Sequence, residues 1–307
     1  MNFIKFIILK STLIIWFGRV MITFIFGRFA LHPIKLNMLE KVKESVAFIR
    51  NSGIANPKIG IILGTGLGGL INDVDVIKSL EYSDIPHFPE STVEFHSGKL
   101  IYGILAGKEV LVMNGRFHFY EGYTLQQITF PVRVMKMLGI ETLLVSNACG
   151  AVNLDFKPAS LMIIEDHINM IPGNPLIGEN IEEFGPRFPD MSQPYDFGLI
   201  EKMEKIALSR NIVLNKGVYV AWMGPNLETR AEYRFAKTMG ADVVGMSTVP
   251  EVLVANHMNM KVAAISVVTD HCDPDNLKPV DIQDILNNAA VVEKDMVVIF
   301  EELIRSL

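Results

Sequence analysis

Residues 114–122 read Asn-Gly-Arg-Phe-His-Phe-Tyr-Glu-Gly and follow an apolar run at 110–113. The run predicts a buried strand, so Arg116, His118 and Tyr120 should emerge near a sheet's edge on one face. Arginine and histidine suit a phosphate or carboxylate, and a phenol suits a sugar hydroxyl. The stretch therefore predicts a site for an anion beside a polyol. By itself it also fits a strand with a salt-bridged arginine and a structural histidine.

The composition of the 307-residue chain indicates a small-molecule partner. Its net charge is -6, and no basic stripe with interleaved aromatic residues is present, which argues against nucleic-acid binding. Two cysteines, Cys149 and Cys272, cannot make a disulfide framework and show no metal-ligand spacing. We therefore expect a cytoplasmic protein without a metal, built as one large α/β domain or two modest ones.

Residues 1–37 differ in composition from the rest of the chain. They contain five basic residues and no acidic one, and are otherwise rich in Ile and Phe. Arg19 separates the apolar runs 11–18 and 20–27, whereas a membrane-spanning helix needs about 20 residues with few charges. No small-residue cleavage site of a signal peptide follows. We expect an upstream extension outside the fold, with the functional protein beginning at Met38; a membrane anchor is the alternative.

Strands and helices alternate after Met38. Helical spacing predicts helices at 38–51, 125–138, 197–210, 229–239 and 282–304, and Pro131 should kink the second. Apolar runs predict strands at 59–63, 99–105, 110–113, 141–146, 161–164, 217–222, 242–245 and 261–268. The segment 172–194 is dense in Gly, Pro and Asn and predicts a long loop. The alternation indicates an α/β fold.

Residues 64–69 read Gly-Thr-Gly-Leu-Gly-Gly, directly after the first predicted strand. The glycines let backbone N–H groups crowd around an anion, and Thr65 adds a hydroxyl donor. The turn also fits the dinucleotide pattern G-x-G-x-x-G, which needs a long crossover helix next. Polar residues and two prolines make 70–89 a poor helix. An NAD-dependent oxidoreductase is thus an alternative that rests on this turn alone, and a turn without any ligand is another.

Polar segments follow most of the predicted strands. Because ligands of α/β proteins bind at the carboxyl edge of the sheet, these segments should share one pocket. Its expected members are Thr65, Arg116, His118, Asn147, Glu228, Ser247 and Asp270. The donors among them suit phosphate, and the two carboxylates suit a nitrogenous ring. Tyr120 and Met246 are expected to flank a sugar.

From about residue 39 to residue 307 the chain resembles the trimeric purine nucleoside phosphorylases. The shared motifs, in the family's order, are Gly-Thr-Gly-Leu-Gly, Ser-Thr-Val-x-x-His-x-Gly, Gly-Arg-Phe-His-x-Tyr-Glu-Gly, Asn-Ala-x-Gly, Gly-Pro-x-x-Glu-Thr and Gly-Met-Ser-Thr-Val-Pro-Glu. The resemblance implies one α/β domain over 38–307, with a central mixed sheet flanked by helices, assembled as a homotrimer. It implies phosphorolysis of purine ribonucleosides and 2'-deoxyribonucleosides to free base and pentose 1-phosphate in purine salvage. Inorganic phosphate would be the co-substrate, without metal or organic cofactor.

The resemblance also implies roles for single residues. Phosphate would be bound by Thr65, Arg116, His118, Ala148 and Ser247, with His96 near it. Ribose would be held by Tyr120 and Met246, and the base by Leu227, Glu228, Val244 and Asp270. The expected catalytic residues among these are His118, Glu228 and Asp270. Glu228 would orient the ring through an N–H, and Asp270 would hydrogen-bond or protonate N7.

Two positions depart from the family pattern. Asp270 stands where most members specific for 6-oxopurines carry Asn. An ionised Asp repels a 6-oxo group and welcomes a 6-amino group, whereas a protonated one can donate to the oxygen or to N7. Ile282 replaces a histidine that contacts the ribose 5'-hydroxyl in some members. At both positions the chain resembles the methylthioadenosine phosphorylases. A methylthioadenosine phosphorylase or a 6-aminopurine nucleoside phosphorylase is therefore an alternative. A membrane-tethered nucleoside-binding protein is an alternative from another class.

Overall fold

The computed structural model describes residues 37–64, 66–90, 97–279 and 281–307, together with the backbone of four earlier strands. The chain forms two units, residues 1–41 and 42–307. In the first unit β1 (Ile4–Leu9), β2 (Thr12–Phe17), β3 (Val20–Ile25) and β4 (Arg28–Pro33) pair antiparallel in sequence order. None of the helices in these described parts is long and apolar enough to cross a membrane. The expectation that residues 1–37 lie outside the functional fold stays a prediction.

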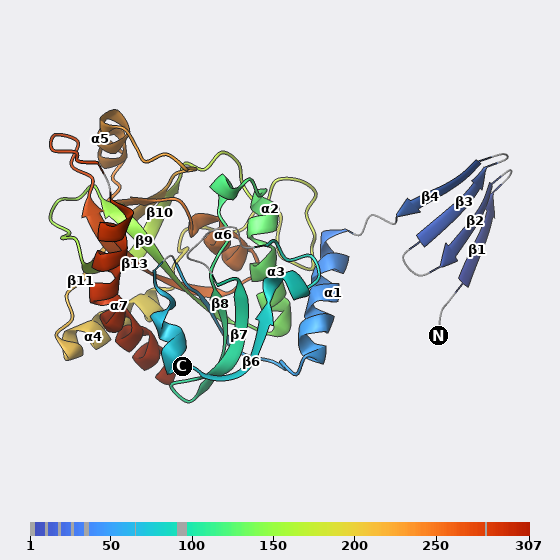
Figure 1. Ribbon diagram of the computed structural model, residues 1–307, viewed down its shortest axis with the longest axis horizontal. Helices are drawn as coiled ribbons and strands as arrows, with labels where there is room; N and C mark the ends of the chain where they lie inside the picture. The colour runs from blue at the N-terminus through green and yellow to red at the C-terminus, as the bar shows by residue number, and fades with distance from the viewer. Residues whose placement is uncertain are drawn as a thin grey trace. The chain divides into compact units, whose positions relative to one another are not determined.

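The second unit is built on a nine-stranded mixed sheet flanked by helices (Figure 1). The spatial order is β12-β11-β10-β13-β9-β5-β8-β7-β6. The strands are β5 (Ile59–Ile62), β6 (Asp75–Glu81), β7 (Lys99–Leu105), β8 (Lys108–Asn114), β9 (Thr142–Ala151), β10 (Ser160–Asn169), β11 (Leu214–Ala221), β12 (Val243–Gly245) and β13 (Lys261–His271). The neighbouring strands β8, β5, β9 and β13 are parallel, so their carboxyl ends meet at one edge. The predicted α/β class with a mixed sheet is confirmed.

The sheet closes on itself at one end. Beyond its pairing with β5, β9 continues and pairs antiparallel with β12 through Gly150 and Ala151. Since β12 also pairs with β11, the strands β9, β13, β10, β11 and β12 form a closed ring. The polar segments that follow β12 and β13, and the last residues of β9, therefore come to the same end of this ring.

Seven α-helices lie in the part of the chain that the structure describes, and most of them match the predicted ranges. They are α1 (Met38–Asn51), α2 (Leu125–Ile128), α3 (Phe130–Leu138), α4 (Phe197–Arg210), α5 (Arg230–Thr238), α6 (Val249–His257) and α7 (Ile282–Arg305). The helix predicted at 125–138 is two helices that meet at Thr129. Pro131 lies in the first turn of α3, where its missing N–H costs no helix bond.

The long C-terminal helix shows how apolar spacing builds the core. In α7 the buried positions Val292, Met296, Ile299, Phe300 and Leu303 recur at helical spacing. This stripe packs the helix on α4 and β13. Burial of each large side chain stabilises the fold by about 1.5–3 kcal/mol. The start of α7 is thereby held close to the end of β13, beside the polar segments.

The glycine-rich turn is not part of a dinucleotide fold. After β5 and this turn, the chain forms a short 3-10 helix, η1 (Gly68–Asp73), and then β6. β6 pairs antiparallel with β7 at the end of the sheet. A dinucleotide-binding unit requires a crossover helix that leads to a parallel strand, and the described residues 66–90 contain no α-helix. The oxidoreductase alternative therefore loses its structural basis.

Candidate active site

A cavity of about 170 Å³ lies where the polar segments converge. Ten of the twelve predicted site residues line it: Arg116, His118, Tyr120, Ala148, Leu227, Glu228, Val244, Met246, Ser247 and Asp270. The other two, Thr65 and His96, lie outside the described residues. Gly64, directly before Thr65, does line the cavity. The structure thus brings together segments separated by up to 221 positions, from Gly64 to Ile285, and the individual roles of the residues stay predictions.

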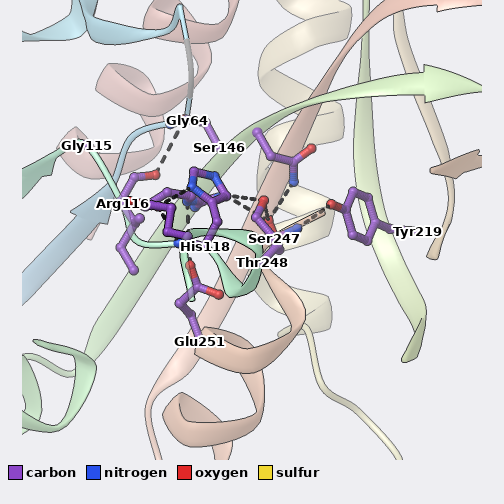
Figure 2. A network of polar contacts seen from close by, with 12 residues as sticks. Gly64, Gly115, Arg116, His118, Ser146, Tyr219, Ser247, Thr248 and Glu251 are labelled. Carbon is purple, nitrogen blue, oxygen red and sulfur yellow. Dashed lines mark hydrogen bonds and ion pairs between the residues drawn. The ribbon is translucent and has the colours of Figure 1, made fainter. Parts of the chain in front are cut away.

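Arg116 is a fully buried cation fixed by three side chains, as Figure 2 shows. It follows Gly115, whose φ of 110° turns the chain away from β8 and whose carbonyl accepts a bond from the Tyr82 hydroxyl at 2.8 Å. Its Nη1 donates to the hydroxyls of Ser247 at 2.7 Å and Thr248 at 3.1 Å. Its Nε lies 3.5 Å from Oε1 of the buried Glu251. The guanidinium is therefore held in one orientation beside the hydroxyl predicted to share its anion.

Ser247 and Thr248 stand directly before α6. Thr248 has φ 71° and ψ −55°, an uncommon conformation for a β-branched residue that costs about 1–3 kcal/mol. Its hydroxyl accepts from Asn147 Nδ2 at 2.9 Å as well as from Arg116. The Ser247 amide donates to the Tyr219 hydroxyl at 3.2 Å. The strained turn thus places two hydroxyls and a helix N-terminus, which favours anions, at the cavity.

Gly64 and Asn147 bring two strand ends into close contact. A Cβ on Gly64 would lie 2.8 Å from the Asn147 Cα and from the Ser146 carbonyl oxygen, so only glycine fits there. The Gly64 amide donates to Ser146 Oγ at 3.2 Å. Asn147 Oδ1 is buried and has no hydrogen-bond partner among the described residues. The end of β5 is therefore packed directly on β9, where Asn147 and Ala148 line the cavity.

His118 is buried and oriented by Glu121. Glu121 Oε1 accepts from the His118 backbone N–H at 2.7 Å and lies 2.9 Å from its Nδ1. Because an ionised carboxylate only accepts, this contact favours the tautomer with its proton on Nδ1. The ring also stacks on Tyr120, with centroids 4.7 Å apart and an interplanar angle of 14°. The predicted phosphate and ribose residues are thus in direct contact.

Tyr120 and Met246 lie on either side of Gly224. A Cβ on Gly224 would lie 2.4 Å from Met246 Sδ and 3.2 Å from Tyr120 Cδ1, and its φ of 62° also favours glycine. Burial raises the pKa of the Tyr120 hydroxyl to about 12. The phenol is therefore protonated at neutral pH and can donate a hydrogen bond. An apolar thioether and a phenol beside each other suit the face and hydroxyls of a pentose.

Two carboxylates occupy another part of the cavity wall. Glu228 lies just before α5, and burial raises the pKa of its carboxyl, partly offset by a hydrogen bond from Tyr233. Asp270 lies on β13 after a register shift, since Val268 pairs with Cys149 and Asp270 with Gly150. The extra residue, Thr269, re-aims the following side chain, as bulges next to active sites do. Thr269 Oγ1 lies 2.8 Å from Asp270 Oδ1.

The role of Ile282 toward the 5' substituent stays a prediction. Ile282 opens α7 and is 56% exposed, and it is not among the residues that line the cavity. Ile285, one turn further along the helix, does line it. Residues three apart in a helix share one face, so Ile282 and Ile285 lie on the same side of α7. The residue that α7 contributes to the cavity, Ile285, is apolar.

Five residues that support the site were not predicted from the sequence. Glu251 and Glu121 contact Arg116 and His118, Thr248 joins Arg116 to Asn147, and Tyr233 and Cys272 contact the two carboxylates. For Glu121 a signal existed, because a Glu three residues after a His suits a capping box. Tyr233 and Cys272 stand close in sequence to Glu228 and Asp270, but neither spacing belongs to a recognised motif.

The cavity is chemically divided. Donors gather around Arg116, His118 and Ser247, and acceptors at Glu228 and Asp270. The donors can bind a dianion, and the acceptors can receive N–H groups of a heterocycle. Across the described residues no group of three or more His, Cys, Asp or Glu side chains is placed to hold a metal ion. The expectation that no cofactor takes part stays a prediction.

Comparison with known proteins shows to which family the chain is similar. A family model described as Phosphorylase superfamily matches residues 58–305. Purine nucleoside phosphorylase 1 of Bacillus subtilis is 54% identical over 76% of this chain and 86% of the relative. Purine nucleoside phosphorylase of Bos taurus is 45% identical over 75% of this chain and 82% of the relative. The crystal structure of Schistosoma mansoni purine nucleoside phosphorylase with inosine has a TM-score of 0.83 and 41% identity, and covers 89% of this chain and 98% of its own. The structure of Schistosoma mansoni purine nucleoside phosphorylase with adenosine has a TM-score of 0.83 and 40% identity, and covers 89% of this chain and 99% of its own.

Proposed function

The chain belongs to the phosphorylase superfamily, and we propose that it acts as a purine nucleoside phosphorylase. It transfers the pentose of a purine nucleoside to inorganic phosphate and releases the free base. The observation that carries this function is the divided cavity, in which fixed donors and two carboxylates face one space. The sequence identity to enzymes of that name supports the same reaction.

The donor side is suited to hold phosphate for attack. Arg116 and the hydroxyl of Ser247 are already bonded to each other at 2.7 Å, so little rearrangement is needed to bind a dianion. Groups fixed in advance cost less to order when the transition state forms. As the glycosidic bond breaks, the pentose gains the character of an oxocarbenium cation. The negative charge of the bound phosphate stabilises that cation. A phosphate oxygen then forms the new bond to the anomeric carbon.

The acceptor side is suited to the departing base. A purine leaves more easily when its ring is held and its developing negative charge is neutralised by a proton. Glu228 can accept an N–H of the ring, and the carboxyl of Asp270 can hydrogen-bond to N7 or to the group at C6. The raised pKa of Glu228 reflects its burial in the cavity wall.

Several finer properties belong to this proposal. A homotrimer, a cytoplasmic location and inorganic phosphate as the co-substrate follow from the resemblance of the motifs. The presence of Asp270, an acceptor when ionised, favours a substrate range that includes 6-aminopurine nucleosides besides inosine and guanosine. Ile285, an apolar residue of α7 at the cavity, suits a 5'-substituted pentose such as that of methylthioadenosine.

The decisive experiment compares base release from four nucleosides with and without phosphate. Inosine, guanosine, adenosine and methylthioadenosine are incubated with the protein, and free base and pentose 1-phosphate are quantified by chromatography. We expect release that depends on phosphate and yields equal amounts of the two products. Release without phosphate would indicate a hydrolase, and binding of NADH with no phosphate-dependent reaction would favour an oxidoreductase.

A further inference from the structure

Tyr233 and Cys272 line the cavity next to the two carboxylates, and the mechanism above gives them no role. Tyr233 lies in α5, five positions after Glu228, and Cys272 follows the end of β13, two positions after Asp270. Both side chains are buried, at 3% and 2% exposed. Each therefore comes from the same segment as one carboxylate of the base pocket.

Each of these side chains lies beside one carboxylate. Tyr233 and Glu228 line the same cavity, and the Tyr233 hydroxyl lowers the pKa of the Glu228 carboxyl against the effect of burial. The Cys272 thiol donates to Asp270 Oδ2, with Sγ 3.5 Å away. The two side chains also pack in one cluster of buried residues. The pair thus links the loop before α5 to the end of β13, which are about 40 positions apart in the sequence.

Both linking groups are neutral donors. Burial is the largest cause that raises the pKa of the Tyr233 hydroxyl and of the Cys272 thiol, so each keeps its proton at neutral pH. A neutral donor can stabilise an ionised carboxylate without adding a charge to the pocket. Tyr233 and Cys272 each leave the other lone pairs of their carboxylate available to N–H groups of a base.

The surroundings hold this pair in place. The Cys272 amide donates to the Ala151 carbonyl at 2.7 Å, which continues the pairing of β13 with β9. Tyr233 and Cys272 belong to one apolar cluster with Val152, Val220 and Val244. Close packing of this kind restricts rotamers, so the two donors have fixed positions.

We propose that Tyr233 and Cys272 are positioning residues for the purine base, which together hold the Glu228 and Asp270 carboxylates in a fixed relative arrangement. The inference deepens the proposed function and rests on it. It assigns base selectivity to four linked side chains rather than to Asp270 alone. A change in Tyr233 or Cys272 should alter how the protein discriminates between purines while phosphate binding stays the same.

The first test is Tyr233→Phe, which removes only the hydroxyl. A hydrogen bond to a charged group is lost, so we expect the nucleoside KM to rise about tenfold with the phosphate KM unchanged. Tyr102→Phe is the matched control, because Tyr102 is a buried tyrosine in β7 that does not line the cavity. The control should leave both KM values at the level of the unchanged protein.

The second test uses Cys272→Ala and Cys272→Ser, measured with adenosine and with inosine. Without the thiol, the Asp270 carboxylate loses a hydrogen bond and is no longer held in one orientation. The ratio of kcat/KM for the two nucleosides should therefore move toward one by about threefold or more. Cys272→Ser keeps a donor of similar size and should restore much of the discrimination. A variant that only loosens the fold would lower both kcat/KM values equally and leave the ratio unchanged.

Two outcomes of these kinetic measurements would overturn the inference. If Tyr233→Phe behaves like Tyr102→Phe, or if its phosphate KM rises as much as its nucleoside KM, Tyr233 does not position the base. An unchanged adenosine to inosine ratio in Cys272→Ala excludes the role of the thiol, even if Tyr233→Phe fails to fold. Absence of phosphorolysis in the unchanged protein is a separate result, which overturns the proposed function and this inference with it.

Discussion

At the scale of single residues, Arg116 shows how a buried cation is prepared for a ligand. Its fork is bonded to Ser247 and Thr248 and paired with Glu251, and all four side chains are buried. Removal of the whole side chain would leave Glu251 as an unpaired buried charge, which costs about 3–5 kcal/mol. The informative change is therefore one that keeps the positive charge and removes the planar fork.

Arg116→Lys should raise the phosphate KM by about tenfold or more, because a lysine cannot make the paired bonds of a guanidinium. The nucleoside KM at saturating phosphate should change less. Steady-state kinetics with phosphate as the varied substrate measures this. Glu251→Gln is the control, since it breaks the ion pair but keeps the bonds from Arg116 to the hydroxyls. Equal effects on both substrates in Arg116→Lys would contradict a role in phosphate binding.

Asp270→Asn should shift the preference toward inosine and guanosine over adenosine. An amide can donate to a 6-oxo group, whereas an ionised carboxylate only accepts. We expect the ratio of kcat/KM for inosine to that for adenosine to rise about tenfold, the size of one hydrogen bond to a charged group. Competition between the two nucleosides in one reaction gives the ratio directly. If the ratio does not change, position 270 does not read the group at C6.

Glu228→Gln should raise thermal stability while it impairs base recognition. Burial raises the pKa of Glu228, so its stabilising contribution is fully present below the unfolded pKa and is lost as the pH rises through the folded pKa. The variant should therefore melt about 1–3 °C higher at pH 8 and at the same temperature near pH 4. Glu232→Gln is the control: bonds from Thr229 lower the pKa of Glu232, so no gain is expected at pH 8. A gain at pH 4 as large as at pH 8 would contradict the electrostatic cause.

Residues that act through short local motifs could be predicted from the sequence, and residues that act across the fold could not. Arg116, Glu228 and Ser247 stand in recognisable patterns at the ends of apolar runs, where a sheet collects ligand-binding groups. Thr248, by contrast, has a positive φ that its β-branched side chain gives no reason to expect. Thr65 and His96 lie outside the described residues, so their predicted roles stand as predictions.

At the scale of elements, the interiors of the buried strands were predictable and their ends were not. The edge strand β6 was not predicted, because all but one of its residues are exposed and it has no apolar run. β9, β10 and β13 each run several residues beyond the apolar runs that signal them. The extra residues of β9 include Asn147 and Gly150, which are held in the strand by pairing with β12 and β13 rather than by their own preference. The polar residues of the site are thus strand residues, although they looked like loop residues in the sequence.

Gly150→Ala should disrupt the base side of the cavity. A Cβ at this position would lie 2.3 Å from Cys272 Sγ and 3.3 Å from Asp270 Oδ2. Such overpacking typically costs about 1–3 kcal/mol and would displace Asp270, so the melting temperature should fall and the nucleoside KM should rise. The double variant Gly150→Ala with Cys272→Ala removes the clashing sulfur and should recover most of the melting temperature. No recovery would show that the close contact with Cys272 is not the cause.

At the scale of the whole molecule, the start of the enzyme unit can be tested by shortening the chain. Asn37 and Glu40 form a reciprocal cap on α1: the Glu40 amide donates to Asn37 Oδ1 at 2.9 Å, and the Asn37 amide to Glu40 Oε2 at 3.2 Å. A chain that begins at Met38 lacks this cap, which is worth about 1 kcal/mol. We expect full phosphorolytic activity with a melting temperature lower by about 1–3 °C.

The matched comparison is a chain that begins with a methionine placed directly before Asn37. This chain keeps the cap and should melt at the temperature of the full-length protein, with the same kcat/KM. Loss of activity in both shortened chains would show that residues 1–36 belong to the functional protein. The prediction follows from the division of the chain into two units and from the capping bonds, both of which are local.

The closed ring of strands has a consequence for how this protein meets other chains. Each strand of the ring is already paired on both sides. In that region no strand edge has unpaired backbone N–H and C=O groups to which a strand of another polypeptide could bond. In the nine-stranded sheet the open margin is β6, at the opposite end, where Lys78, Asp75 and Glu81 are exposed. Strand exchange through the nine-stranded sheet would have to begin at that border, which also exposes Val76 and Ile77, and not in the ring that holds the cavity.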